Sequence, residues 1–347
     1  MKRALAMLAS SLALGFGGLY LAVGGALFEA ETYRMQDPSL GLLALCGLAL
    51  VAQWMAPGIK LQLLCRGQSV FLTYRSALLA HLVAVLGAAL TPSNTGGAPA
   101  TVVALGRLGV PAGKGIGVVV QVFVLDLVFF SWSAPLGLFY LIYSDIISLP
   151  RQAEVFALVA VGLAVAVALV LSRRPKLVSR VILAVAKRPL FRRFDDRLIS
   201  VARDYTRSAR AYRRMSGADW MRLHVVTAVG WLAGFVILWC TLGLYGSEVG
   251  LFTVLALLGS LTLISHFVPT PGGSGFMEAS VALAVGAGAG SVAAAVLSWR
   301  LLSFYLIFLI GPAAGWLLYF SKPLSRPPAS GQAPPPAPEK RPEEPSA

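Results

Sequence analysis

The sequence predicts an all-α polytopic membrane protein with about six full spanning helices and two oppositely oriented re-entrant hairpins. Of its 347 residues, 57% are apolar and 13% charged, and the mean hydropathy is +0.76, more apolar surface than a soluble domain buries. Apolar stretches occur at 4–28, 38–57, 76–90, 116–143, 153–172, 223–245, 251–268, 276–290 and 292–320. Because a crossing takes about 20 residues, 76–90 and 276–290 are too short, and both flank glycine-rich breaks.

Charge orients the predicted helices. The segment 173–222 carries 15 Lys and Arg against four Asp, so the positive-inside rule makes this basic loop cytoplasmic, and the start at Lys2 and Arg3 as well. The first apolar run is longer than the core of a secretory signal, so we expect an uncleaved first helix. The domain is expected to span 1–320, and the Pro-rich segment 321–347 is expected to be a disordered cytoplasmic tail.

Counting crossings between the cytoplasmic anchors makes 76–115 begin and end inside, with "LTPSNTGGAPA" at 90–100 as its tip. The two segments beside this tip are too short for two crossings, so they favour a re-entrant hairpin. The count of crossings alone permits either arrangement. After 223–245, the segment 251–290 begins and ends outside, with "VPTPGGSGFME" at 268–278 as its tip. Both clusters could also be ordinary extramembrane turns.

The two tips share a Thr-Pro and Gly-Gly pattern, which is typical of an inverted-repeat transporter. Broken helices survive inside a membrane only against protein or a wet cavity. Half-helices starting near Ala98 and Phe276 would direct N–H groups at an anion such as a phosphodiester. The expected lipid-binding residues are Thr91, Pro92, Ser93, Gly96, Gly97, Asp126, Pro271, Gly272, Gly273, Gly275, Glu278 and Arg300.

Each charged residue of this set has more than one interpretation. Asp126, within an apolar helix, suggests a functional site or a structural ion pair. Glu278 suggests function or a helix cap. Arg300 would pair with either acid, bind phosphate or extend its head to the membrane surface. His81 and His266 suggest proton relays or plain interhelical hydrogen bonds.

Three motifs resemble the transmembrane region of lysylphosphatidylglycerol synthase/flippase proteins: "TPSNTGGAPATVVALGRLGVPAGKG" at 91–115, Asp126, and "PTPGGSGFMEA" at 269–279. The resemblance covers about 1–320 and implies binding or flipping of a phospholipid or isoprenoid-linked lipid. The family often has acidic residues where this chain has Ala98-Pro99 and Gln121. In full-length members an aminoacyl-transferring domain follows, whereas here the Pro-rich tail follows, so we expect no lipid lysylation.

Other functions find less support in the sequence. There is no GxSxG, HExxH or Asp-rich metal motif, so we expect no enzyme, metal or cofactor, and Cys46, Cys65 and Cys240 predict no disulfide framework. Arg203, Arg207, Arg210 and Arg214 predict an amphipathic helix that lies on anionic lipid or serves only as a topology signal, and no nucleic-acid binding. "GAGAG" at 286–290 would permit a homo-oligomer. We expect a lipid flippase of the cytoplasmic membrane that acts on an anionic, aminoacylated or isoprenoid-linked lipid; the alternative is an accessory subunit or enzyme acting on a lipid-linked intermediate.

Overall fold

The computed structural model describes residues 2–24, 33–36, 38–144, 195–286 and 290–320, with single helical positions between 155 and 184. Its helices are α1 (Lys2–Val23), α2 (Leu40–Arg66), α3 (Tyr74–Ala89), α4 (Gly97–Arg107), α5 (Ala112–Tyr143), α8 (Asp195–Tyr212), α9 (Gly217–Leu244), α10 (Leu251–Ser265), α11 (Phe276–Val285), α12 (Gly290–Arg300), the π-helical η4 (Leu301–Tyr305) and α13 (Ile307–Phe320). Among the described residues, four helical runs are long and apolar enough to span a membrane: α2, α5, α9 and the continuous run Ser291–Phe320. The predicted all-α polytopic class is confirmed.

Some predicted segments fall outside the described residues. These are the span at 153–172, the tail at 321–347, and much of the basic loop at 173–222 before α8. The first helix is present as α1. The second extends beyond the expected end at residue 57, because Pro57 is accommodated inside α2.

The described helices form two series of matching order and length. The first is α2, α3, α4 and α5, with 27, 16, 11 and 32 residues. The second is α9, α10 and α11, with 28, 15 and 10 residues, followed by the 30-residue run Ser291–Phe320. The packing is reciprocal: α2 packs against α9, α3 against α13, and α10 against α5. This arrangement is that of the predicted inverted repeat.

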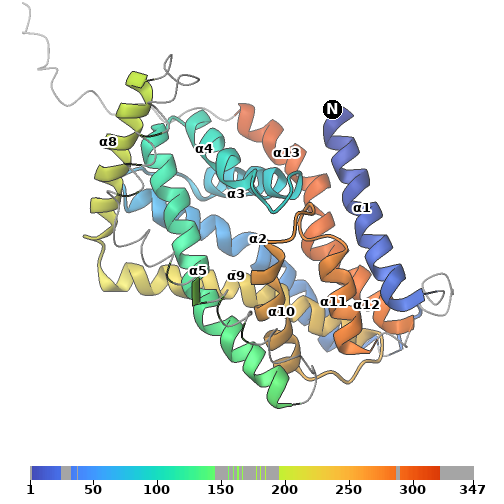
Figure 1. The fold of residues 1–347 in the computed structure, drawn as a ribbon. Helices are drawn as coiled ribbons and strands as arrows, with labels where there is room; N and C mark the ends of the chain where they lie inside the picture. The colour runs from blue at the N-terminus through green and yellow to red at the C-terminus, as the bar shows by residue number, and fades with distance from the viewer. Residues whose placement is uncertain are drawn as a thin grey trace, which may run out of the picture.

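Each series contains one helical hairpin that ends inside the molecule. At about 1.5 Å per residue, α4 and α11 are only half as long as the hydrocarbon is thick. The two hairpins approach from opposite sides, and their tips meet near the centre of the molecule (Figure 1), where Pro92 and Pro271 form an antiparallel bridge. This contact favours re-entrant hairpins, since turns on opposite membrane faces would lie about 30 Å apart.

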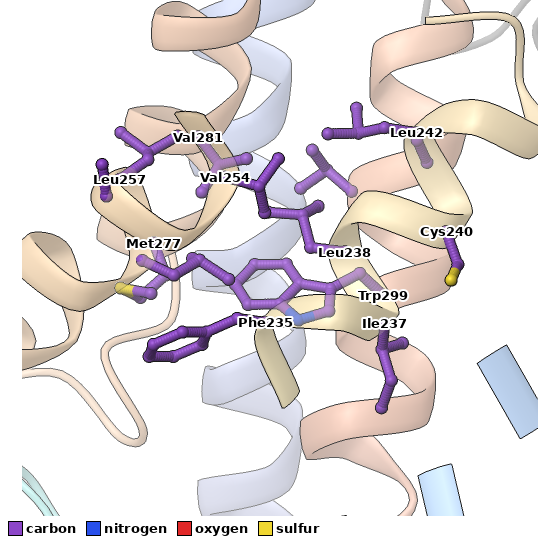
Figure 2. Packing of buried hydrophobic residues seen from close by; sticks show 14 of the residues in the cluster. Phe235, Ile237, Leu238, Cys240, Leu242, Val254, Leu257, Met277, Val281 and Trp299 are labelled. Carbon is purple, nitrogen blue, oxygen red and sulfur yellow. The ribbon is translucent and has the colours of Figure 1, made fainter. Parts of the chain in front are cut away.

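The second hairpin is held by a hydrophobic cluster on α9. Figure 2 shows the Trp299 indole beside Phe235 and Leu238, with Val281 of α11 nearby, and these side chains are buried. The indole Nε1 donates a hydrogen bond of 3.2 Å to the carbonyl oxygen of Gly234. Trp299 therefore fixes the height of the following residue, Arg300, along α9.

The apolar stripe of α8 packs on protein, which corrects the expectation that it lies on the inner leaflet. Tyr205, Ala209 and Tyr212 are buried, and α8 packs along α5. Leu198 and Val201 continue the stripe in the sequence, and their side chains are outside the described residues. The same pattern suits a lipid surface or a helix surface, and here α5 supplies the apolar partner.

Tyr212 joins α8 to the end of α2. Its hydroxyl donates to the carbonyl oxygen of Leu64 at 3.0 Å and accepts from Gln68 Nε2. Burial raises the pKa of the Tyr212 phenol, so the hydroxyl remains a neutral donor.

Replacing Tyr212 by Phe is expected to lower the free energy of unfolding by about 1–3 kcal/mol, because a buried carbonyl and a buried amide each lose a partner. Thermal unfolding in detergent, followed by intrinsic fluorescence, measures the change. Tyr143→Phe is the matched control, since the Tyr143 side chain is 81% exposed. Equal unfolding temperatures for the two variants would contradict the assignment.

Candidate functional site: a charged cavity between two hairpin tips

A cavity of about 690 Å³ lies between the two series of helices. Both hairpin tips line it, through Ser93 and Gly272, together with α2, α3, α5, α9 and α12. Its charged lining side chains include Lys60, Asp126 and Arg300. The volume falls in the range of about 300–1,000 Å³ that is typical of ligand sites.

The tip of the first hairpin is closed by its own backbone and one threonine. The Thr91 hydroxyl donates to the carbonyl oxygen of Gly87 at 3.0 Å and accepts from the Gly96 N–H at 2.7 Å. Ser93 and Asn94 both have positive φ, 51° and 57°, which reverses the chain within two residues. Gly96 has no room for a side chain, because a methyl group would lie 2.7 Å from Thr91 Cγ2.

The helix that follows, α4, begins without a side-chain cap. Its N-cap residue is Gly96, and its first turn contains no acidic residue. Gly97 and Ala98 line the cavity, so this end of α4 faces the space between the hairpins. A helix N-terminus carries a partial positive charge and attracts anions.

The tip of the second hairpin is closed by a buried ion pair. Glu278 Oε2 accepts from the Gly275 N–H at 2.8 Å, while Glu278 Oε1 accepts from Arg300 Nε at 2.7 Å. Arg300 Nη2 also donates to the carbonyl oxygen of Gly272 at 3.2 Å. The Glu278 side chain is fully buried. The N-terminus of α11 is thus capped by its own chain, and the two tips are not equivalent.

Glycines allow this second tip to form. Gly272, Gly273 and Gly275 have φ values of 60°, 67° and 85°, a region that other residues rarely adopt. α1 lies against the tip so closely that a methyl group on Gly18 would overlap the Gly275 backbone. The first helix therefore packs directly against this tip and against α11.

A second ion pair crosses the cavity from α2 to α5. Lys60 Nζ lies 2.7 Å from Asp126 Oδ1, and this oxygen also accepts from Trp231 Nε1 of α9 at 2.9 Å. The Asp126 side chain is 23% exposed, while that of Lys60 is 9% exposed. This pair is therefore more open to the cavity than the pair between Glu278 and Arg300.

The π-helical segment η4 aligns the buried pair. In a π-helix the hydrogen bonds join residues five apart, so Arg300 and Tyr305 lie on one face. Both contact Glu278, since the Tyr305 hydroxyl donates to Oε1 at 3.2 Å. From α2, Gln53 Nε2 donates to the Ser303 carbonyl oxygen at 2.9 Å, and Trp54 Nε1 donates to that of Leu302 at 3.3 Å. α2 thereby holds the π turn in place.

A protein-family model covers most of the chain, including the residues of the cavity. The model of the family described as lysylphosphatidylglycerol synthase TM region matches residues 7–311, which include both hairpins, both ion pairs and η4. The chain belongs to this family. No curated protein matches the chain. As a member of the lysylphosphatidylglycerol synthase transmembrane-region family, it is a membrane protein that associates with lipid.

Within this family member, the residues expected from the sequence divide into two groups. Ser93, Gly97, Asp126, Gly272 and Arg300 line the cavity. The others build the tips: Thr91 and Gly96 close the first, Pro92 and Pro271 form the bridge, and Gly273, Gly275 and Glu278 shape the second. Arg300 pairs with Glu278, which is one of the alternatives expected for it.

Sequence reasoning missed two residues of the site, Lys60 and Trp231. The second expected apolar stretch ends at residue 57, and the crossing count makes the following loop at 58–75, which carries Lys60, cytoplasmic. In the structure α2 continues to Arg66 and carries Lys60 into the cavity. A lysine within a long apolar segment was the available signal, since an acid at such a depth needs a cation nearby.

Proposed function

We propose that the protein binds the phosphate headgroup of a membrane lipid in this cavity and moves it across the cytoplasmic membrane. The observation that carries the proposal is the cavity itself, between two oppositely directed hairpins whose tips meet. It offers Lys60 and the uncapped N-terminus of α4 to an anion. The acyl chains remain in the surrounding lipid.

The reciprocal packing of the two series of helices supports transport. Each hairpin packs on the last spanning run of the other series, α3 on α13 and α10 on α5. A rocking motion of one series against the other would open the cavity to one face and close it to the other. The substrate is a phospholipid, anionic or aminoacylated, or an isoprenoid-linked lipid, and both termini lie in the cytoplasm, as the basic residues indicate.

Reconstitution tests this function. Purified protein is placed in liposomes that carry fluorescent phospholipids with anionic, zwitterionic or aminoacylated headgroups, and the loss of fluorescence from one leaflet is followed. Asp126→Asn is compared with Asp219→Asn, which makes the same chemical change in an exposed pair with Arg222. We expect headgroup-dependent exchange that Asp126→Asn slows and Asp219→Asn leaves intact. Absence of exchange for every headgroup in folded protein would favour an accessory or enzymatic role.

The bridge between the tips provides a second test. Residues opposite each other in an antiparallel bridge have Cα atoms about 4.5–5.5 Å apart, a distance that suits a disulfide. Pro92→Cys combined with Pro271→Cys, in a background without the three native cysteines, is expected to form a disulfide under mild oxidation and to stop exchange. Reduction should restore exchange.

Either single cysteine variant is the control for this experiment. It should show exchange with and without oxidant. Full exchange by the oxidised double variant would show that transport needs no separation of the tips, and would contradict the rocking motion.

A further inference from the structure

We propose that the cavity takes up one proton with each anionic headgroup, and that Asp126 accepts this proton when the headgroup replaces it beside Lys60. The inference rests on the proposed function, because it concerns the coupling of the same site.

The contacts of Lys60 are the first step. Its ammonium group lies 2.7 Å from Asp126 Oδ1, and the same oxygen accepts a hydrogen bond from Trp231 Nε1 at 2.9 Å. The Lys60 side chain is only 9% exposed, so its ammonium has little open surface, and a phosphate that binds it closely would take the place of that carboxylate. Headgroup binding thus exchanges one anion for another beside a single cation.

Arg300 is not available for the same exchange. Its partner Glu278 is fully buried, and Arg300 also holds the Gly272 carbonyl oxygen of the second tip. Displacing Glu278 would uncap α11 and open the hairpin. The cavity's exchangeable cation is therefore Lys60.

Charge balance then requires a proton. The pair of Lys60 and Asp126 is neutral as a unit, and a phosphodiester adds one negative charge. Of its two partners among the described residues, a displaced Asp126 carboxylate would keep the indole N–H of Trp231. An incompletely paired charge inside the membrane is costly. A proton taken up from the buffered solution forms one O–H bond on the carboxylate, which becomes a neutral acid and restores neutrality, and the buffer acid that releases the proton balances the step.

Other titratable groups near Asp126 could accept the proton in its place. Of the helices packed against α5, α2 contributes Lys60 and α9 contributes Trp231. α4 contributes no titratable side chain to the cavity lining, and α8 keeps its described arginines exposed. α10 contributes His266, whose Nδ1 lies 2.8 Å from the Thr262 carbonyl oxygen. The cavity lining also includes Arg300 and His81 of α3, and His81 interacts electrostatically with Lys60. The two histidines are thus the alternatives to test.

Proton counting in the wild-type protein is the direct test. The protein in a neutral maltoside detergent is titrated with dihexanoyl-phosphatidylglycerol, or with glycerophosphoglycerol, which is the same headgroup without acyl chains. Calorimetry in buffers of different ionisation heat gives the protons taken up, and the intrinsic tryptophan fluorescence of the protein gives an independent affinity. We expect about one proton per headgroup, and a Kd that rises by up to about tenfold per pH unit. Dihexanoyl-phosphatidylcholine, whose own cation can pair with Asp126, should take up none.

Variants locate the acceptor. Asp126→Asn should bind phosphatidylglycerol without proton uptake, with a Kd that is independent of pH and lower than that of wild type at neutral pH, because Lys60 is no longer occupied by a carboxylate. A merely structural Asp126 would give weaker binding instead. His81→Gln and His266→Gln should keep the proton uptake.

Three results separate the possible failures. Tight wild-type binding without proton uptake overturns the coupling but leaves lipid binding standing. Proton uptake that disappears in either histidine variant but persists in Asp126→Asn also overturns it. Binding of neither probe at any pH would contradict the proposed function itself. The same proton count with both probes supports the coupling for a phosphodiester with or without acyl chains.

Discussion

Replacing Glu278 by Ala is expected to lower the free energy of unfolding by about 3–5 kcal/mol, because it leaves the buried Arg300 guanidinium without its carboxylate. The same change removes the cap from the N–H of Gly275. Thermal unfolding in detergent measures the loss. Arg222→Gln is the control, since it breaks an exposed pair that contributes about 0–1 kcal/mol.

A second variant separates the contribution of the ion pair from that of the other contacts made by Arg300. Replacing Glu278 and Arg300 together by Met removes both charges and keeps apolar volume at the site, so we expect most of the stability to return. A double variant as unstable as Glu278→Ala would show that the contacts of Arg300 with the Gly272 carbonyl and the ring of Phe304 matter more than the ion pair.

Replacing Lys60 by Met and Asp126 by Leu together is expected to abolish headgroup exchange while the protein stays folded. The double change removes a charge pair without leaving an unpaired ion in the membrane. Exchange should fall at least about tenfold, corresponding to about 1.4 kcal/mol or more of lost stabilisation. The liposome assay measures the rate, and thermal unfolding verifies the fold.

The single variant Lys60→Met provides the contrast. It leaves the Asp126 carboxylate without its cation, so we expect it to lose both stability and exchange. Normal exchange in the folded double variant would show that this ion pair takes no part in handling the headgroup, and would move the anion site to the N-terminus of α4.

The sequence predicted the hairpins because Gly and Pro interrupt long apolar runs and because charge limits the number of crossings. It also predicted that Glu278 could cap a half-helix, since that contact is local. Pairings between distant helices were harder. Nothing near Lys60 shows that Asp126 of α5 faces it, and the apolar stripe of α8 does not show whether lipid or α5 covers it.

The π turn could not be predicted from the sequence, for a different reason. The residues Leu301–Tyr305 are as apolar as their neighbours, and hydropathy does not distinguish five residues per hydrogen-bonded turn from four. The π turn depends on Gln53 and Trp54 of α2, whose side chains donate hydrogen bonds to the carbonyl oxygens within it. Such a contact becomes visible only once the two helices are placed side by side.

A π turn is equivalent to one extra residue in an α-helix, and this makes the C-terminal helix sensitive to chain length. Deleting Ser303 would restore regular α-helix and rotate α13 by about 100° relative to α12. Gly311 would then leave Leu86 of α3, which it approaches so closely that a methyl group would lie 2.8 Å away. Ala314 and Leu318 would turn away from their buried positions. In this part of the protein, single-residue insertions and deletions should therefore be tolerated less than apolar substitutions, although both leave the hydropathy of the span unchanged.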